Sequence, residues 1–243
     1  MNTTLIAHEI PTGTLFSRQD ISTIALKADP SFSETLLRNL LEKLMNMGIL
    51  SRIGRNCYIK ERASDKPIYK NDYSETAQGL LAIMKERFPL LAYRVWELGW
   101  LNEFLNHLIT HNLICLDIEK EGCEYVFESL KAEYNGKLLL MPNADQLHRY
   151  AEHDSIIISR LVTEAPFIKE NSPEVPLEKI NVDLRANKAI RSTIHAGEIP
   201  NIIVDMVEKY TVDRTKLLRY ASRRNKKAEL SVILESVKWC GGG

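Results

Sequence analysis

Residues 33–60, SETLLRNLLEKLMNMGILSRIGRNCYIK, decide how the N-terminal part of this chain is expected to fold. Leucine and methionine recur at helical spacing after Ser33, an N-cap residue, and Gly48 is suited to end the helix. Two short runs of alternating residues, 49–53 and 57–60, then flank a turn-forming Gly-Arg-Asn triplet. The stretch therefore predicts a helix followed by a two-stranded ribbon.

A second, shorter helix is expected just upstream of this stretch. Ser17 is a good N-cap residue with Asp20 three positions later, and Asp29 and Pro30 mark the turn that ends the helix. The order helix, longer helix and ribbon predicts a winged helix-turn-helix over residues 1–62, in which the longer helix is the recognition helix and the ribbon is the wing.

A winged helix binds DNA by presenting short polar and cationic side chains to base edges while the wing contacts phosphates. Residues 1–62 contain 8 basic and 6 acidic residues, a net charge of only +2, so two copies on DNA are a further expectation. Glu34 and Glu42 keep open the alternative that this module contacts only protein. The candidate DNA-binding residues are Ser33, Thr35, Arg38, Asn39, Lys43, Arg52, Arg55 and Asn56.

Helical and extended patterns alternate from residue 74 to residue 161, which favours an α/β (α+β) domain with a small sheet of about four strands. Among these patterns is a helix expected over Leu101–His111. The choice between a parallel and a mixed sheet stays open. Beyond Pro176 the pattern is helical, so residues 73–240 are expected to form one α/β domain with a helical C-terminal part, after a polar linker that ends near Asp72.

The composition is that of an ordinary soluble globular protein, with 44% hydrophobic and 26% charged residues. No apolar run approaches the roughly 18 residues of a membrane span, and the first residues lack a signal-peptide pattern, so a cytoplasmic location is expected. The four cysteines show no CxxC spacing, and we expect reduced thiols, no disulfide framework and no structural zinc site. The total charge is zero, so any nucleic-acid binding must come from a local patch.

Residues 213–227, DRTKLLRYASRRNKK, form the most basic stretch, with seven cations and one acid. On a helix, Leu217 and Leu218 lie on one side and the cations lie roughly opposite. Arginine density favours docking to carboxylate or phosphate, although a charge run is commonly a solvated face. The candidate partner-binding residues are Lys216, Arg219, Arg223 and Arg224.

Catalytic and metal-binding patterns are weak by comparison. Asp117 and Glu119 fall on one face of an expected strand, as in a nucleotidyltransferase that holds magnesium, but no glycine-serine element precedes them. His107 and His111 have the spacing of one helical turn without a third ligand. No phosphate loop, nucleophile elbow or dinucleotide motif occurs, so no catalytic residue, metal or cofactor is assigned.

Five segments together resemble the AbiEi-type antitoxins and their winged-helix relatives in bacterial toxin-antitoxin and abortive-infection operons. They are TGTLFSRQDI, LLEKLMNMGILSRIGRNCYI, FPLLAYRVWEL, VPLEKINVDL and LLRYASRRNK. The resemblance implies a non-enzymatic protein with an operator-binding module that represses its own operon and a C-terminal domain that counters a nucleotidyltransferase-like toxin. It also draws attention to Glu178, Lys179 and Asp183 in the LEK-x-x-VD stretch and to Arg219, Tyr220, Arg223 and Arg224 in the RYA-x-RR element.

The leading hypothesis is therefore a DNA-binding autoregulator and antitoxin whose partners are operator DNA and a nucleotidyltransferase-like toxin protein, with no membrane. Two alternatives belong to other classes: a nucleotidyltransferase-like enzyme that uses Asp117 and Glu119 with magnesium, and a scaffold that does not bind DNA.

Overall fold

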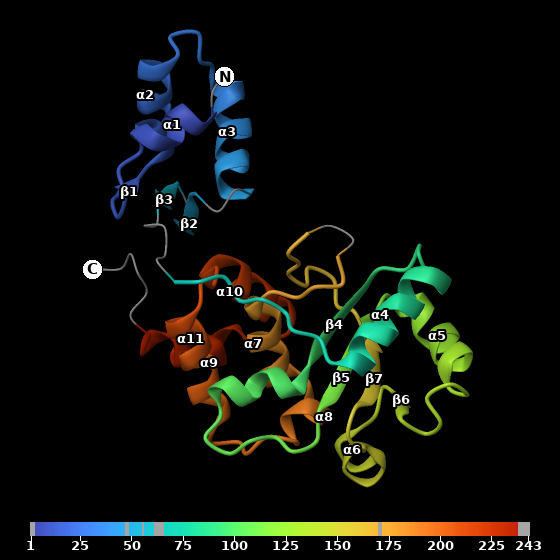
Figure 1. Cartoon of the computed structure of the whole chain (residues 1–243). Coiled ribbons are helices and arrows are strands. Elements are labelled where there is room, and N and C mark those ends of the chain that lie inside the picture. Colours follow the sequence, from blue (N-terminus) through green and yellow to red (C-terminus); the bar gives the residue numbers. More distant parts are fainter. Residues whose placement is uncertain (1–2, 47–48, 55, 61–65, 170–171, 238–243) are drawn as a thin grey trace. The chain divides into compact units, whose positions relative to one another are not determined.

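The computed structural model describes residues 3–46, 49–54, 56–60, 66–169 and 172–237. The chain divides into an N-terminal unit that ends at Lys66 and a C-terminal unit, Pro67–Val237 (Figure 1). Within the described residues, no helix combines the length and the apolar character that crossing a membrane requires.

The N-terminal unit contains three helices and a small antiparallel sheet with the strand order β1-β3-β2. The two helices and the ribbon expected from the sequence are confirmed, whereas the first helix and the first strand were not predicted. The elements are α1 (Thr3–Glu9), β1 (Leu15–Phe16), α2 (Arg18–Ala28), α3 (Glu34–Asn46), β2 (Ser51–Gly54) and β3 (Cys57–Ile59).

Leucines of α3 form the centre of the N-terminal core. Leu37, Leu40 and Leu44 are at most 1% exposed and pack with Ile21 of α2, because helical spacing puts them on one side of the helix. Ser17 begins α2 through a capping box with Asp20, as its sequence predicted. This core fixes which side of α3 faces solvent.

The C-terminal unit is built on a mixed four-stranded sheet with the order β4-β5-β7-β6. β4 runs antiparallel to β5, while β5 and β6 both run parallel to β7. The prediction of about four strands is confirmed, and the open choice resolves to a mixed sheet. The strands are β4 (Tyr93–Glu97), β5 (Leu113–Ile118), β6 (Leu138–Leu140) and β7 (Ser155–Arg160).

Helices cover the sheet. The helices α4, α5 and α6 are interleaved with the strands, and the chain continues after β7 into a set of C-terminal helices (Figure 1). The predicted helical C-terminal part is confirmed. The helices are α4 (Glu75–Arg87), α5 (Cys123–Leu130), α6 (Ala144–Tyr150), α7 (Leu177–Ala186), α8 (Lys188–Arg191), α9 (Ile199–Lys209), α10 (Arg214–Arg223) and α11 (Lys227–Glu235).

Strand alternation separates the two faces of this sheet. Leu116 and Ile118 of β5 join the apolar core formed with α4 and α5. Cys115 and Asp117 of the same strand point to the opposite face, because successive side chains in a strand alternate. That opposite face lies against α7, α8 and α10 and carries the polar groups considered below.

The helix predicted over Leu101–His111 is wrong. A 3₁₀-helix, η1, spans Leu98–Phe104, and the following residues up to the start of β5 are irregular. The Asn102 side chain accepts a hydrogen bond from the Ile109 N–H (2.6 Å) and donates one to the Ile109 carbonyl (3.2 Å). An asparagine that bonds nearby backbone in this way competes with helical hydrogen bonding.

The last residues of the expected linker pack on the C-terminal unit. The Pro67 carbonyl accepts a hydrogen bond from the Thr211 N–H (3.0 Å), and the Asn71 side chain bonds the backbone of Val175 in both directions. The chain from Pro67 onward is therefore part of this unit.

Candidate functional site

The solvent-facing side of α3 carries four of the predicted DNA-binding residues. Thr35, Arg38, Asn39 and Lys43 are all exposed, on the side opposite the buried leucines. Ser33 precedes the helix, and its Oγ accepts a long hydrogen bond from the Leu36 N–H (3.5 Å), so its side chain serves to begin the helix.

The β2–β3 hairpin carries the remaining predicted contacts. Arg52 is exposed, and its Nε donates to the Gly54 carbonyl (3.2 Å), which holds the side chain along the hairpin. Asn56 adopts a left-handed conformation with φ of 59°, and its Oδ1 accepts a hydrogen bond from the Arg18 N–H (2.9 Å). Asn56 therefore ties the turn to the start of α2. Arg55 lies outside the described residues.

The C-terminal unit contains a buried cluster of charged groups. Lys179 of α7 is 1% exposed and donates to Oδ2 of Asp117 on β5 and to Oδ2 of Asp183 one turn along α7 (2.6 Å). Oδ1 of Asp183 accepts from the Tyr220 hydroxyl (2.9 Å) and lies 3.7 Å from a guanidinium nitrogen of Arg224. Three segments far apart in sequence thus meet around one lysine.

The electrostatics of the cluster favour retention of protons. Burial lowers the pKa of Lys179, but the carboxylates of Asp117 and Asp183 outweigh it and raise that pKa above its usual value. Burial also raises the pKa of Asp117, against the opposing effect of Lys179. Both pKa values are raised, which is consistent with the net negative charge of two carboxylates around one ammonium group.

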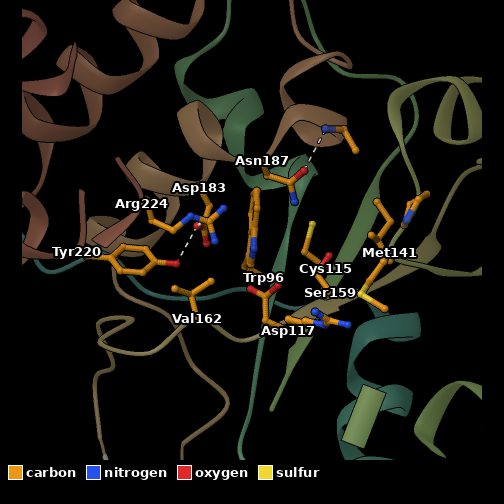
Figure 2. Close-up of a pocket in the computed structure, with 14 residues that line it drawn as sticks. Trp96, Cys115, Asp117, Met141, Ser159, Val162, Asp183, Asn187, Tyr220 and Arg224 are labelled. Carbon is orange, nitrogen blue, oxygen red and sulfur yellow. Dashed lines mark hydrogen bonds and ion pairs between the residues drawn. The ribbon is translucent and has the colours of Figure 1, made fainter. Parts of the chain in front are cut away.

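A cavity of about 290 Å³ lies beside this cluster (Figure 2). Asp117 and Asp183 line it together with Trp96, and Figure 2 shows Tyr220 and Arg224 approaching Asp183. Cys115 also lines it, but burial raises the pKa of that thiol well above its usual value, so the thiol stays protonated at neutral pH. The other lining residues are Met141, Pro142, Ile157, Ser159, Arg160, Val162, Asn187 and Ala189.

The cavity brings Asp117 together with Asp183 and does not include Glu119. Glu119 lies just after the end of β5, where it precedes a short 3₁₀-helix. Asp117 and Glu119, considered from sequence as a magnesium-holding pair, therefore do not line one cavity. The carboxylate that accompanies Asp117 comes instead from α7, with Lys179 between the two acids.

The predicted partner-binding residues have different surroundings. Arg219 is exposed on α10. Arg223 donates from Nε to the Thr163 hydroxyl (2.8 Å), and Lys216 lies 3.6 Å from a carboxylate oxygen of Asp213. Arg224 follows α10 and lines the cavity. The basic stretch is therefore not one uniform surface.

Two histidines considered from the sequence, His107 and His111, line a second cavity of about 460 Å³, together with His148 and His195. Nδ1 of His107 lies 3.1 Å from Oε1 of Glu198. Nowhere in the described ranges do three or more His, Cys, Asp or Glu side chains gather closely enough to hold a metal ion.

The buried cluster was not predicted as a site, although Lys179, Asp183 and Tyr220 were quoted for the family resemblance and Asp117 was considered as part of a magnesium-holding pair. Lys179 and Asp183 have the i, i+4 spacing of an ordinary surface ion pair, so spacing alone gave no indication of burial. The available signal was the composition of α7, in which every residue from Leu177 to Leu184 is buried and the sequence offers apolar side chains on more than one face.

The two units define a mixed α/β protein that combines a small helical and antiparallel module with a four-stranded sheet unit containing a polar cavity. The chain belongs to the family described as "Family of unknown function (DUF6577)", whose model matches residues 36–238. No curated protein matches the chain. The matched residues include most of α3, the buried cluster and the three quoted segments of the C-terminal unit.

Proposed function

We propose that the N-terminal unit is a winged helix-turn-helix that binds operator DNA, and that the protein represses its own operon and counters a nucleotidyltransferase-like toxin. The observation that carries this proposal is the two-sided α3. Its apolar side is buried among α1, α2 and the hairpin, and its other side exposes Arg38 and Asn39.

The exposed side chains are of the kinds that recognise DNA bases by hydrogen bonding. Arginine can bind guanine and asparagine can bind adenine in the major groove with two hydrogen bonds each. Arg52, on the hairpin that follows, is suited to contact phosphate as the wing does in such modules. Because residues 1–62 carry a net charge of only +2, specific base contacts and a second copy of the chain contribute more than bulk attraction.

The DNA-binding proposal is tested by gel shifts on DNA from upstream of the protein's own gene, with random DNA as competitor. Asn39→Ala should lower the preference for upstream DNA by about 10-fold, since a good base contact contributes about 1–3 kcal/mol. Arg38→Ala should weaken binding and reduce its salt dependence.

Lys27→Ala is the matched control, because it removes an exposed cation from α2 in the same unit. Its effect on the preference for upstream DNA should be small. Equal affinity for upstream and random DNA, or no loss in either α3 variant, would refute operator binding and favour the scaffold that contacts only protein.

For the partner, the C-terminal unit supplies an exposed arginine on an amphipathic helix. Leu217 and Tyr220 anchor α10 in the core, and Arg219 faces solvent, where it can meet a carboxylate of another protein. Arg224 is unsuited to this role because it lies against Asp183. The identity of the partner as a toxin rests on the resemblance of the five segments quoted above.

Co-expression with the product of the adjacent gene tests this part of the proposal. The chain should restore growth and co-purify with that product, and Arg219→Glu should reduce both effects. Arg149→Glu on α6 is the matched control, since it reverses the same charge at another exposed position. No rescue by the unaltered chain, or equal loss in the two variants, would refute the role of α10.

A further inference from the structure

The cavity beside Lys179 lies where α/β proteins commonly bind small molecules. Asp117 is near the carboxyl end of β5, and Ser159 and Arg160 are at the carboxyl end of the neighbouring parallel strand β7. Ligands of open α/β sheets bind in crevices outside these strand ends. At about 290 Å³, the cavity can hold a ligand at the small end of the usual range.

Several of the polar groups that line the cavity are hydrogen-bond donors. Asn187 begins α8 by accepting the N–H groups of Ala189 (3.0 Å) and Ile190 (3.2 Å) at Oδ1, so its amide nitrogen is left as a donor on the cavity side (Figure 2). Arg224 is 3.7 Å from its nearest carboxylate, beyond hydrogen-bond distance, so its N–H groups remain available. Arg160 is exposed and forms no ion pair with any residue that the structure describes.

One acceptor is also free. Asp117 is 8% exposed, and Lys179 occupies only its Oδ2. Oδ1 accepts no hydrogen bond from the described part of the chain. Oδ1 is not enclosed by the protein, so it can accept a hydrogen bond from a ligand hydroxyl in the cavity.

The charges around the cavity favour an anion. The carboxylates of Asp117 and Asp183 are accompanied by the cations Lys179, Arg160 and Arg224, which leaves one positive charge in excess. Two guanidinium groups, an amide and the Ser159 hydroxyl offer more donors than the two oxygens of a carboxylate can accept. A phosphate monoester has three terminal oxygens and matches this set better.

We propose that this cavity binds a small phosphate monoester that also carries a hydroxyl group, with Arg160, Arg224 and Asn187 on the phosphate and Asp117 on the hydroxyl. A pentose phosphate and a nucleoside monophosphate share this chemistry. None of these residues belongs to α3, and Arg219 is not among them, so the proposal does not depend on whether the protein binds DNA.

The test is isothermal titration calorimetry on the full chain with ribose 5-phosphate, adenosine 5′-monophosphate, inorganic phosphate, ribose and citrate. One of the two phosphate esters should bind at least 10-fold more tightly than inorganic phosphate, and ribose and citrate should bind more weakly still. The ester that binds identifies the source of the phosphate.

Variants then locate the site. Arg160→Gln alters an exposed side chain without disturbing the fold and should weaken ester binding at least 10-fold, as should Arg224→Gln. Asp117→Asn should reduce the preference for the ester over inorganic phosphate. Arg149→Gln on α6 is the matched control and should leave affinity unchanged.

Several results would overturn the proposal. They are no binding of either ester, citrate binding more tightly than both esters, inorganic phosphate binding as tightly as the esters, or unchanged ester affinity in Arg160→Gln. Unfolding of the Arg224 or Asp117 variants would leave Arg160→Gln to decide the outcome.

Discussion

Replacing Lys179 by methionine tests whether the buried cluster holds the C-terminal unit together. Methionine keeps the length of the side chain but leaves the carboxylates of Asp117 and Asp183 without their shared ammonium group. Asp183 keeps the Tyr220 hydroxyl at 2.9 Å, whereas Asp117 loses its only hydrogen bond from the described residues. Removing one partner from a buried ion pair costs about 3–5 kcal/mol, and we expect about 4 kcal/mol near pH 8.

The loss should depend on pH in a defined direction. Burial already raises the pKa of Asp117, and removal of Lys179 raises it further, so the folded variant takes up a proton as the pH falls. Protonation removes the uncompensated charge. The destabilisation by Lys179→Met should therefore be smaller at pH 5 than at pH 8.

Urea titration followed by tryptophan fluorescence measures this effect, because Trp96 lies in the same cavity and is 2% exposed. Lys209→Met is the matched control, since Lys209 also pairs with a carboxylate, that of Glu103, but at the surface, where a pair contributes about 0–1 kcal/mol. A loss below about 1 kcal/mol in Lys179→Met, or the same loss at pH 5 and pH 8, would refute the description of the cluster as a buried ion network.

Two further changes have defined outcomes. Burial raises the pKa of Glu178, so the stability that its protonated form provides below pH 4.5 is lost as the pH rises through the folded-state pKa. Glu178→Gln should therefore stabilise the protein more at pH 7 than at pH 4 in urea titrations, and an equal effect at both would contradict this cause. Lys60→Met removes hydrogen bonds from Nζ to the carbonyls of Ala7 (2.6 Å) and Ile10 (2.8 Å) and should cost the N-terminal unit about 2 kcal/mol. Faster hydrogen exchange in α2 and α3 is the measurement, and unchanged exchange would show that these bonds contribute little.

Apolar patterns predicted the larger elements because burial of apolar side chains is what holds them. The leucines of α3 recur at helical spacing, whereas β5 and β7 contain short runs that are buried on both faces of the sheet. α1 and β1 were not predicted because a seven-residue helix and a two-residue strand are too short to show a clear hydrophobic periodicity. α1 is held by tertiary contacts, such as the Lys60 side chain on its last carbonyls.

The candidate site could be predicted less well than the fold, since its contacts are long-range. Lys179 meets Asp117 across 62 positions of sequence, and Tyr220 meets Asp183 across 37. Contacts between residues so far apart in sequence produce no pattern in the local spacing of residues. The i, i+4 pair of Lys179 and Asp183 has the same appearance in sequence whether it is solvated or buried. Its burial follows from the packing of α7 between the sheet and α10, which only the tertiary structure specifies.

The basic stretch 213–227 shows that local sequence can also suggest a surface that the tertiary structure does not form. A count of seven cations suggests one positive surface, yet Arg224 faces the cavity, Arg223 bonds Thr163, and Lys226 pairs with Glu229 at 2.8 Å. Asp183 from α7 and Glu229, just beyond the stretch, therefore neutralise part of a charge that the stretch alone presents as unopposed. Arg219 stays exposed to solvent, while Arg224 contributes its charge to the cavity. The cations of this stretch therefore lie in two environments, solvent and the cavity, because their side chains project from α10 in different directions.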